Sequence, residues 1–273
     1  MLLARSILLA QRDRRARFRS ASGTYQMLQF GNQLRHPCST TDKRPMRIAE
    51  IFRSIQGEGF LTGAESVFVR VSGCNLRCWF CDTPYASWRP EGTDLSLAEI
   101  ISRVTEFDTP HVVLTGGEPM LFSELSPLAT ALRRLGRHVT IETAGTLYLP
   151  VECDLMSISP KLSNSTPTAA DNPRWHHRHE TSRHAPEVVR RLIATGDYQI
   201  KFVVDRLSDC EEIERYLREL SDIRRDRVLL MPQGTTPEEL AERADWLAGY
   251  CDEKGLQYCP RRHIDWFGLV RGT

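Results

Sequence analysis

The chain has 273 residues, of which 41% are hydrophobic and 26% are charged, enough for one large α/β domain or two small ones. The formal net charge of +1 hides an asymmetry: residues 1–45 carry nine Lys and Arg against two acidic residues, a net of +7, which leaves −6 for residues 46–273. No apolar run approaches the ~18 residues of a membrane helix, and the acidic body offers no basic face. Membrane-spanning and nucleic-acid-binding functions are therefore excluded.

Residues 1–45 are rich in Arg and poor in acidic residues. Their apolar stretch, residues 7–10, is too short and too closely flanked by charge for a secretory signal. We expect a disordered extension, or a start placed upstream of a natural beginning at Met46; an organellar transit peptide is the alternative. The folded domain is expected to be residues 46–273.

From Met46 onward, strand-like and helix-like segments alternate. Most strand candidates are short and rich in β-branched residues, as expected for parallel strands buried on both faces. The predicted strands are Arg47–Ser54, Val67–Val71, His111–Thr115, His138–Glu142, Leu155–Ser159, Tyr198–Val204, Arg227–Met231 and Leu256–Cys259.

Between the strands lie amphipathic helices with recognisable starts. Ser96 and Thr236 each begin a capping-box pattern, the second with Pro237 at the first helical position. Further helices are predicted near Glu124–Leu135, Ala185–Ala194 and Asp209–Glu219. About six parallel βα units follow Cys81, fewer than the eight of a closed barrel. We expect a partial, open (β/α) barrel with its site at the carboxyl ends of the strands.

Three cysteines, Cys74, Cys78 and Cys81, are spaced C-x-x-x-C-x-x-C. A structural zinc site uses four protein ligands, and an electron-transfer cluster usually takes four cysteines. Three thiolates on a 4Fe-4S cluster leave one iron open to a small molecule. The alternatives are a zinc loop completed by a distant ligand such as His111, or three unrelated buried cysteines. The other five cysteines are scattered, so we expect free thiols in a reducing cytoplasm.

The spacing of the three cysteines resembles that of the radical S-adenosylmethionine (SAM) enzymes, and this resemblance implies that two motifs at strand ends bind SAM. Leu114–Pro119, which reads LTGGEP, lets exposed backbone groups approach the methionine end of SAM. Ser159, Pro160, Lys161 and Gln233 lie at rim positions that suit its ribose, carboxylate and adenine. Each of these could alone be an ordinary loop residue.

Three features near the cysteines have both a functional and a structural interpretation. Arg70 is a charge inside the apolar run VFVRVSG; it could bind a substrate carboxylate or form a structural ion pair. Asp82 and Thr83 are hard donors suited to Mg²⁺, or an ordinary helix cap. Residues 54–59, SIQGEG, could form a turn with a surface carboxylate.

Ser163–His184 is rich in His, and we expect a solvated insertion that covers the barrel rim.

Together these motifs resemble the 7-carboxy-7-deazaguanine synthases, radical SAM enzymes of queuosine and 7-deazapurine biosynthesis. The resemblance covers Met46 to the C-terminus and rests on SIQGEG, the spacing from Arg70 to the cysteines, CDT at 81–83, TGGEP, ETAGT, SPK and the tail at 262–264. It implies a carbon–nitrogen lyase that converts 6-carboxy-5,6,7,8-tetrahydropterin to 7-carboxy-7-deazaguanine and ammonia. A homodimer and a flavodoxin-like electron donor are also implied.

The resemblance also assigns roles to residues. Cys74, Cys78 and Cys81 would hold the 4Fe-4S cluster, and Thr83 would bind Mg²⁺. Substrate contacts would come from Ile55, Gln56, Gly57, Glu58, Arg70, Thr115, Glu142 and His263, and SAM contacts from Gly117, Ser159, Pro160 and Lys161. The reduced cluster would split SAM to a 5′-deoxyadenosyl radical that abstracts hydrogen from substrate C6; ring contraction would follow, with SAM regenerated.

Two rival functions remain open from the sequence. The first is another radical SAM enzyme, such as an activase of glycyl-radical enzymes, whose cysteine loop is similar but whose substrate is a protein backbone. Arg70, Thr83 and IQGEG argue against it. The second is a non-catalytic zinc or iron–sulfur protein, which would need a fourth cysteine ligand.

Overall fold

A computed structural model describes residues 44–273, so the expectation for the basic extension lies outside the described residues except for Arg44 and Pro45. Nine strands form one sheet in the order β3-β1-β2-β4-β5-β6-β7-β8-β9. Their bounds are β1 Met46–Ile55, β2 Glu65–Val71, β3 Thr93–Leu95, β4 His111–Gly116, β5 His138–Thr143, β6 Leu155–Ile158, β7 Tyr198–Val204, β8 Val228–Pro232 and β9 Gln257–Tyr258.

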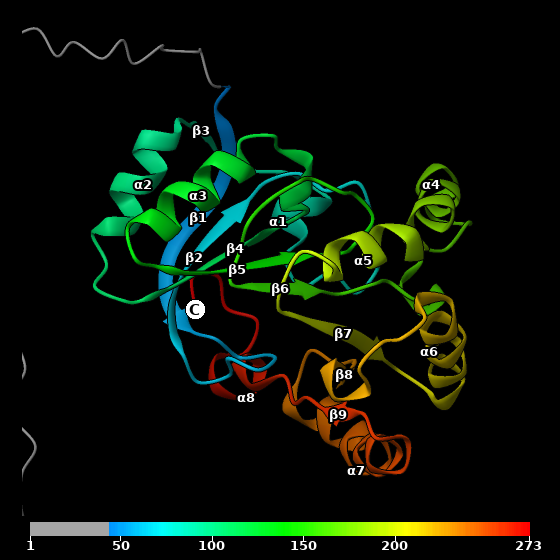
Figure 1. Ribbon diagram of the computed structural model, residues 1–273. Coiled ribbons are helices and arrows are strands. Elements are labelled where there is room, and N and C mark those ends of the chain that lie inside the picture. The colour runs from blue at the N-terminus through cyan, green and yellow to red at the C-terminus, as the bar shows by residue number, and fades with distance from the viewer. Residues whose placement is uncertain (1–43) are drawn as a thin grey trace, which may run out of the picture. The chain divides into compact units, whose positions relative to one another are not determined.

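The sheet confirms the open (β/α) barrel. Every neighbouring pair from β2 to β9 is parallel, and six of these parallel strands, β4 to β9, follow the cysteine loop in the chain. The sheet does not close, because β3 and β9 are its two edges. Figure 1 shows the curved sheet with helices along its outer side. Two features were not predicted: β1 is antiparallel to β2, and the short strand β3 pairs antiparallel with β1.

All five predicted helices are present. Ser96 accepts a hydrogen bond from Glu99 N while the Glu99 carboxylate accepts from Ser96 N, which completes the capping box of α2. Thr236 likewise accepts from Glu239 N, but the Glu239 carboxylate accepts from Thr235 N, so only half of the second box forms. The helices are α2 Leu97–Thr105, α3 Leu125–Arg134, α5 Pro186–Ile193, α6 Leu207–Leu220 and α7 Pro237–Lys254.

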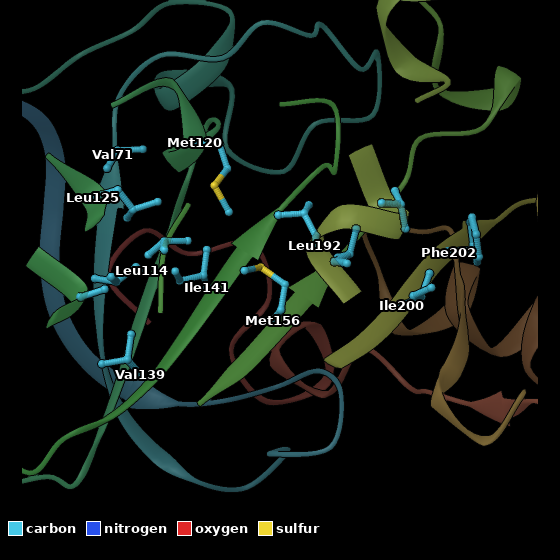
Figure 2. Packing of buried hydrophobic residues seen from close by; sticks show 14 of the residues in the cluster. Val71, Leu114, Met120, Leu125, Val139, Ile141, Met156, Leu192, Ile200 and Phe202 are labelled. Carbon is cyan, nitrogen blue, oxygen red and sulfur yellow. The ribbon is translucent and has the colours of Figure 1, made fainter. Parts of the chain in front are cut away.

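The two faces of the sheet differ in chemistry. Outward side chains such as Leu114 and Ile141, which are register partners on β4 and β5, are fully buried in the main hydrophobic core. Figure 2 shows this core, where Met120 and Leu192 pack with the strand residues. Alternate positions face the other way and mix apolar residues with polar ones such as Thr115, Ser157 and Lys201. The prediction that most strands are buried on both faces is confirmed, because every residue of β6 and β8 and the four central residues of β4 are buried. The polar side chains of the inner face form a site.

The segment Ser163–His184, predicted to be a solvated insertion, is exposed at half of its positions, but it has regular structure and buries three residues. It contains the 3-10 turn η2 (Ser163–Ser165) and the helix α4 (Pro173–Arg183). His179 on α4 has 0% exposure because both of its ring nitrogens are hydrogen-bonded inside the protein. Helices α1 (Pro84–Ser87) and α8 (Arg262–Phe267), which are too short to show a sequence period, were also not predicted.

No helix among residues 44–273 is both long and apolar enough to cross a lipid bilayer.

Candidate active site

A cavity of about 620 Å³ lies at the carboxyl ends of the strands, where parallel α/β folds place their sites. It gathers residues that are scattered over more than 200 positions of the sequence. The predicted site residues on its wall are Ile55, Gln56, Gly57, Glu58, Arg70, Cys74, Cys78, Cys81, Thr83, Thr115, Gly117, Glu142, Ser159, Lys161 and His263. Pro160 and Gln233 do not line this cavity, and the SAM contacts predicted for them remain predictions.

The three cysteines lie on one loop that follows β2, and all three are free thiols. Leu76 N donates to Cys74 Sγ at 3.4 Å, and Ser87 Oγ lies 3.1 Å from Cys81 Sγ. Burial raises the pKa of Cys74 to about 12 and that of Cys78 to about 11. Buried thiols become thiolates only beside strong positive charge, and iron supplies that charge. The donor set fits a cluster bound through three thiolates.

The alternative of a zinc loop completed by His111 does not fit the fold. His111 begins β4, whereas Gly116 at its other end reaches the cavity. Six residues of strand separate these ends by roughly 17 Å. Within residues 44–273, no three His, Cys, Asp or Glu side chains converge closely enough to hold a single metal ion. A cubane differs from a single ion because each of its cysteines binds a different iron.

The two glycines of TGGEP let β4 pack against the start of the cysteine loop. A Cβ on Gly117 would lie 2.1 Å from the backbone oxygen of Gly73, and one on Gly116 would lie 2.2 Å from that of Val71. Gly116 also has a φ of +134°, which favours glycine. The glycines therefore allow the backbone at the end of β4 to contact the backbone that leads into the cysteine loop. This contact sets the position of the cysteines. Glu118 N then donates to Gly73 O at 2.8 Å.

Thr83 occupies the N-cap position of α1, yet its side chain makes no capping hydrogen bond. Its hydroxyl lies 3.8 Å from Cys81 Sγ on the cavity wall. The neighbouring Asp82 carboxylate pairs with Arg261 at 2.8 Å. The Thr83 side chain does not cap α1, and the Asp82 side chain forms an ion pair, so the interpretation of these two residues as an ordinary helix cap is wrong. A hydroxyl that faces the cavity without capping the helix remains available to a hard cation.

Arg70 forms the structural ion pair that was one of its two alternative roles, and binding of a substrate carboxylate stays a prediction. Its Nε lies 2.6 Å from Glu50 Oε1, which is the structural ion pair, and its side chain also lines the cavity. Arg70 is the register partner of Thr115, and Thr115 Oγ1 donates to Glu142 Oε2 at 2.9 Å. Because an Arg fork has two edges, the ion pair through Nε fixes the side chain and leaves the terminal nitrogens for a bound anion.

A buried charge network forms the far wall. Lys201, with a side chain 4% exposed, contacts Glu58 and Glu142 at 3.0 Å each. Arg261 bridges Glu58 at 3.1 Å and Asp82 at 2.8 Å. Burial alone would raise the pKa of Glu58, but Lys201 and Arg261 outweigh burial and hold it well below its usual range. Burial would lower the pKa of Lys201, but Glu142 and Glu58 outweigh it, so that pKa is raised. Glu58 and Lys201 therefore stay charged at neutral pH.

Gly57 explains why His263 lies so close to the SIQGEG segment. A Cβ at Gly57 would lie 2.5 Å from the backbone nitrogen of His263, and Arg262 N donates to Gly57 O at 3.0 Å. The His263 ring then sits 3.8 Å from Glu58 Oε1. The glycine thus brings the first strand end and α8 together, although they are about 200 residues apart.

Sequence reasoning missed Lys201 and Arg261, which both line the cavity. A signal existed for Lys201, because it interrupts the apolar strand YQIKFVV in the same way as Arg70 interrupts VFVRVSG. Arg261 lies in a short connection and carried no such signal. The C-terminal residues 268–273 also line the cavity, and Arg271 is anchored to Glu91 at 2.8 Å with its guanidinium over the Tyr85 ring.

An open parallel barrel with a three-cysteine loop at its rim defines a radical SAM enzyme, and the Radical SAM superfamily model matches residues 68–160. A protein of Rhodopirellula baltica named 7-carboxy-7-deazaguanine synthase is 50% identical over 83% of this chain and 88% of its own length. One of Halobacterium salinarum with the same name is 44% identical, over 82% and 91% of the two chains.

The chain belongs to the 7-carboxy-7-deazaguanine synthase family. The crystal structure of QueE from Escherichia coli shares its fold, with a TM-score of 0.61, 23% identity and coverage of 81% of this chain and 94% of that one.

Proposed function

We propose that this protein is a carbon–nitrogen lyase that converts 6-carboxy-5,6,7,8-tetrahydropterin to 7-carboxy-7-deazaguanine with release of ammonia. The observation that carries the proposal is the composition of one cavity, which is lined by three free thiols together with Arg70, Glu142 and Lys201. A cofactor site and a site for a small polar anion therefore share one space. Family membership supports this reaction.

Binding and orientation of the substrate are assigned to the polar wall. The free edge of Arg70 would take the substrate carboxylate, because a guanidinium held at Nε by Glu50 presents a fixed two-pronged donor. Glu142 and Glu58, both paired with Lys201, would accept hydrogen bonds from the amino and amide groups of the pterin ring. Gln56 and His263 complete this wall, and residues 268–273 exclude water from it.

The cysteine side of the cavity would hold the cluster and SAM. A reduced 4Fe-4S cluster and SAM together supply the carbon-centred radical that takes hydrogen from the substrate. The chain itself supplies the close backbone of Gly117, with Lys161 Nζ donating to Ser159 Oγ at 2.7 Å beside it. These groups would hold SAM in the cavity that the three thiols also line.

We also assign Mg²⁺ to Thr83, because its hydroxyl faces the cavity without capping α1. When bound there, Mg²⁺ would polarise and orient the substrate carboxylate. The protein is further proposed to act as a homodimer in a reducing cytoplasm with a flavodoxin-like electron donor; the seven free cysteines among the described residues fit such a compartment.

The deciding experiment is anaerobic cluster reconstitution followed by incubation with dithionite, SAM and the carboxytetrahydropterin, read by mass spectrometry. We expect 7-carboxy-7-deazaguanine and one equivalent of ammonia. Omission of SAM and a Cys78→Ala variant are the controls, and both should abolish the product.

If the reconstituted protein cleaves SAM but forms no deazaguanine, the proposed substrate is wrong. Only the assignment to the radical SAM superfamily would then remain. Cleavage of SAM stimulated by a glycyl-radical protein instead would favour the activase alternative. A cavity that the chain's own residues 268–273 help to line argues against so large a substrate.

A further inference from the structure

The helix α4 contacts the cysteine loop through the buried His179 and through Trp175. His179 has 0% exposure, and its two ring nitrogens have different partners. Nδ1 lies 3.1 Å from the backbone nitrogen of Arg77, and Nε2 lies 2.9 Å from Ser165 Oγ. Arg77 is the residue directly before Cys78, so the contact reaches the loop between two of the three cysteines.

The backbone partner fixes the tautomer of His179. A main-chain N–H can only donate, so Nδ1 must be the unprotonated acceptor and Nε2 must carry the hydrogen. The Nε2–H therefore donates to Ser165 Oγ, and Ser165 Oγ in turn donates to Leu162 O at 2.6 Å. Burial lowers the pKa of His179 to about 4, which agrees with a neutral ring at neutral pH.

The same segment holds the loop on both sides of Cys78. Before it, Arg77 donates from Nη1 to Cys74 O at 2.8 Å and stacks its guanidinium 3.9 Å from the Trp175 ring of α4. After it, Trp79 N donates to Ser165 O at 3.1 Å. Ser165 thus contacts both His179 and the residue after Cys78. Residues of the segment Ser163–His184 therefore contact the loop on both sides of Cys78.

We propose that His179 is a positioning residue for the cluster: it accepts the Arg77 amide, fixes the peptide that leads into Cys78, and keeps water from that side of the cluster. Hydrogen bonds around the ligands and exclusion of solvent set the affinity and potential of an iron–sulfur centre. Among the described residues, no hydrogen bond joins His179 to a cysteine. The inference rests on the cluster being held by the three cysteines, and not on the identity of the substrate.

Two amide variants separate the two ring contacts. Asn places a carbonyl oxygen near the position of Nδ1, so His179→Asn keeps an acceptor for the Arg77 N–H. Gln places its amide nitrogen near Nε2, so His179→Gln keeps the donor to Ser165 and removes the acceptor. His177→Asn is the matched control, because His177 is exposed on the same helix.

The experiment compares these three variants with the wild-type chain after anaerobic reconstitution. Iron content, the rate of iron loss to a chelator, and the potential and EPR spectrum of the reduced cluster are measured, with thermal unfolding of the iron-free protein as a check on folding. We expect His179→Gln to lose iron about tenfold faster and to show a shifted potential, as changes beside metal ligands usually do. His179→Asn should stay near the wild type, and His177→Asn should be indistinguishable from it.

Each other outcome overturns a defined part of the argument. Equal iron retention and an unchanged potential in His179→Gln would reject the positioning role. Equal damage in His179→Asn and His179→Gln, matched by equal loss of thermal stability without iron, would reject it in favour of simple core packing. A wild-type chain that takes up no cluster would reject the cluster assignment beneath both the inference and the proposed function.

Discussion

Lys201 Nζ lies 3.0 Å from Glu58 Oε2, although 143 residues separate them in the chain. The pair joins the segment after β1, which supplies Glu58, to strand β7, which lies on the far side of β2, β4, β5 and β6 in the sheet. Because Lys201 also contacts Glu142 at 3.0 Å, one ammonium holds two carboxylates of the proposed substrate wall.

Replacing this lysine should cost both stability and binding. Lys201→Met keeps the length of the side chain but leaves the partly buried Glu58 and Glu142 without their shared partner. Removing one partner of a fully buried pair typically costs about 3–5 kcal/mol, and Glu58 keeps Arg261, so we expect the lower end of this range. We expect a comparable fall in the free energy of unfolding, measured by urea denaturation of the iron-free protein. The double variant Lys201→Met/Glu58→Gln should recover part of the loss. A double variant as unstable as the sum of the singles would show that the pair is not coupled.

Arg70 should control affinity for the substrate without affecting the cluster. Arg70→Gln removes the fork proposed to bind the carboxylate, so we expect KM to rise by about tenfold to a hundredfold, about 1.4 to 2.7 kcal/mol of lost binding. Iron content and SAM binding should be unchanged. Arg53→Gln is the matched control: Arg53 lies on β1, its side chain is 51% exposed, and its ion pair with Glu65 lies at the surface. An unchanged KM in Arg70→Gln would leave only the structural ion pair with Glu50.

Gly117 should tolerate no side chain. In Gly117→Ala the new methyl group would lie 2.1 Å from Gly73 O and 2.7 Å from Ala86 O, both of them backbone atoms that cannot move aside cheaply. We expect a loss of about 1–3 kcal/mol from overpacking and reduced iron uptake, because Gly73 begins the cysteine loop. Gly249→Ala is the control: Gly249 lies within α7, and apart from its chain neighbours and the nearby backbone of α7 itself nothing lies within 4 Å of the place its new methyl group would take. The change should therefore stabilise the helix by about 0.5–1 kcal/mol.

The barrel and most residues of the cavity wall could be predicted from the sequence, for a physical reason. Strand ends of a parallel sheet meet at one edge, so motifs that follow strands, such as Thr115–Gly117 and Ser159–Lys161, must come together. Lys201 was missed because it lies inside a strand and not at its end, and its partners become visible only when strand register is known. His179 was missed because composition marked its segment as polar, while tertiary hydrogen bonds buried the ring.

The neutral state of His179 makes stability depend on pH in a defined direction. The pKa of His179 is lowered by burial from 6.5 to about 4, so between these values the unfolded chain binds a proton that the folded chain does not. The contribution is fully present above pH 6.5 and is lost progressively as the pH falls toward 4, with a slope of at most about 1.4 kcal/mol per pH unit from this group. His179→Asn has no ring to protonate and should lack this part of the slope. Thermal unfolding of both iron-free proteins at about pH 7.5, 6.5, 5.5 and 4.5 gives the stability of the wild type relative to His179→Asn. This stability difference should become steadily smaller below the ordinary histidine pKa. Parallel curves for the two proteins over this range would mean that the ring has the same pKa in the folded and unfolded chains. That result would contradict a neutral ring held by the Arg77 N–H at Nδ1.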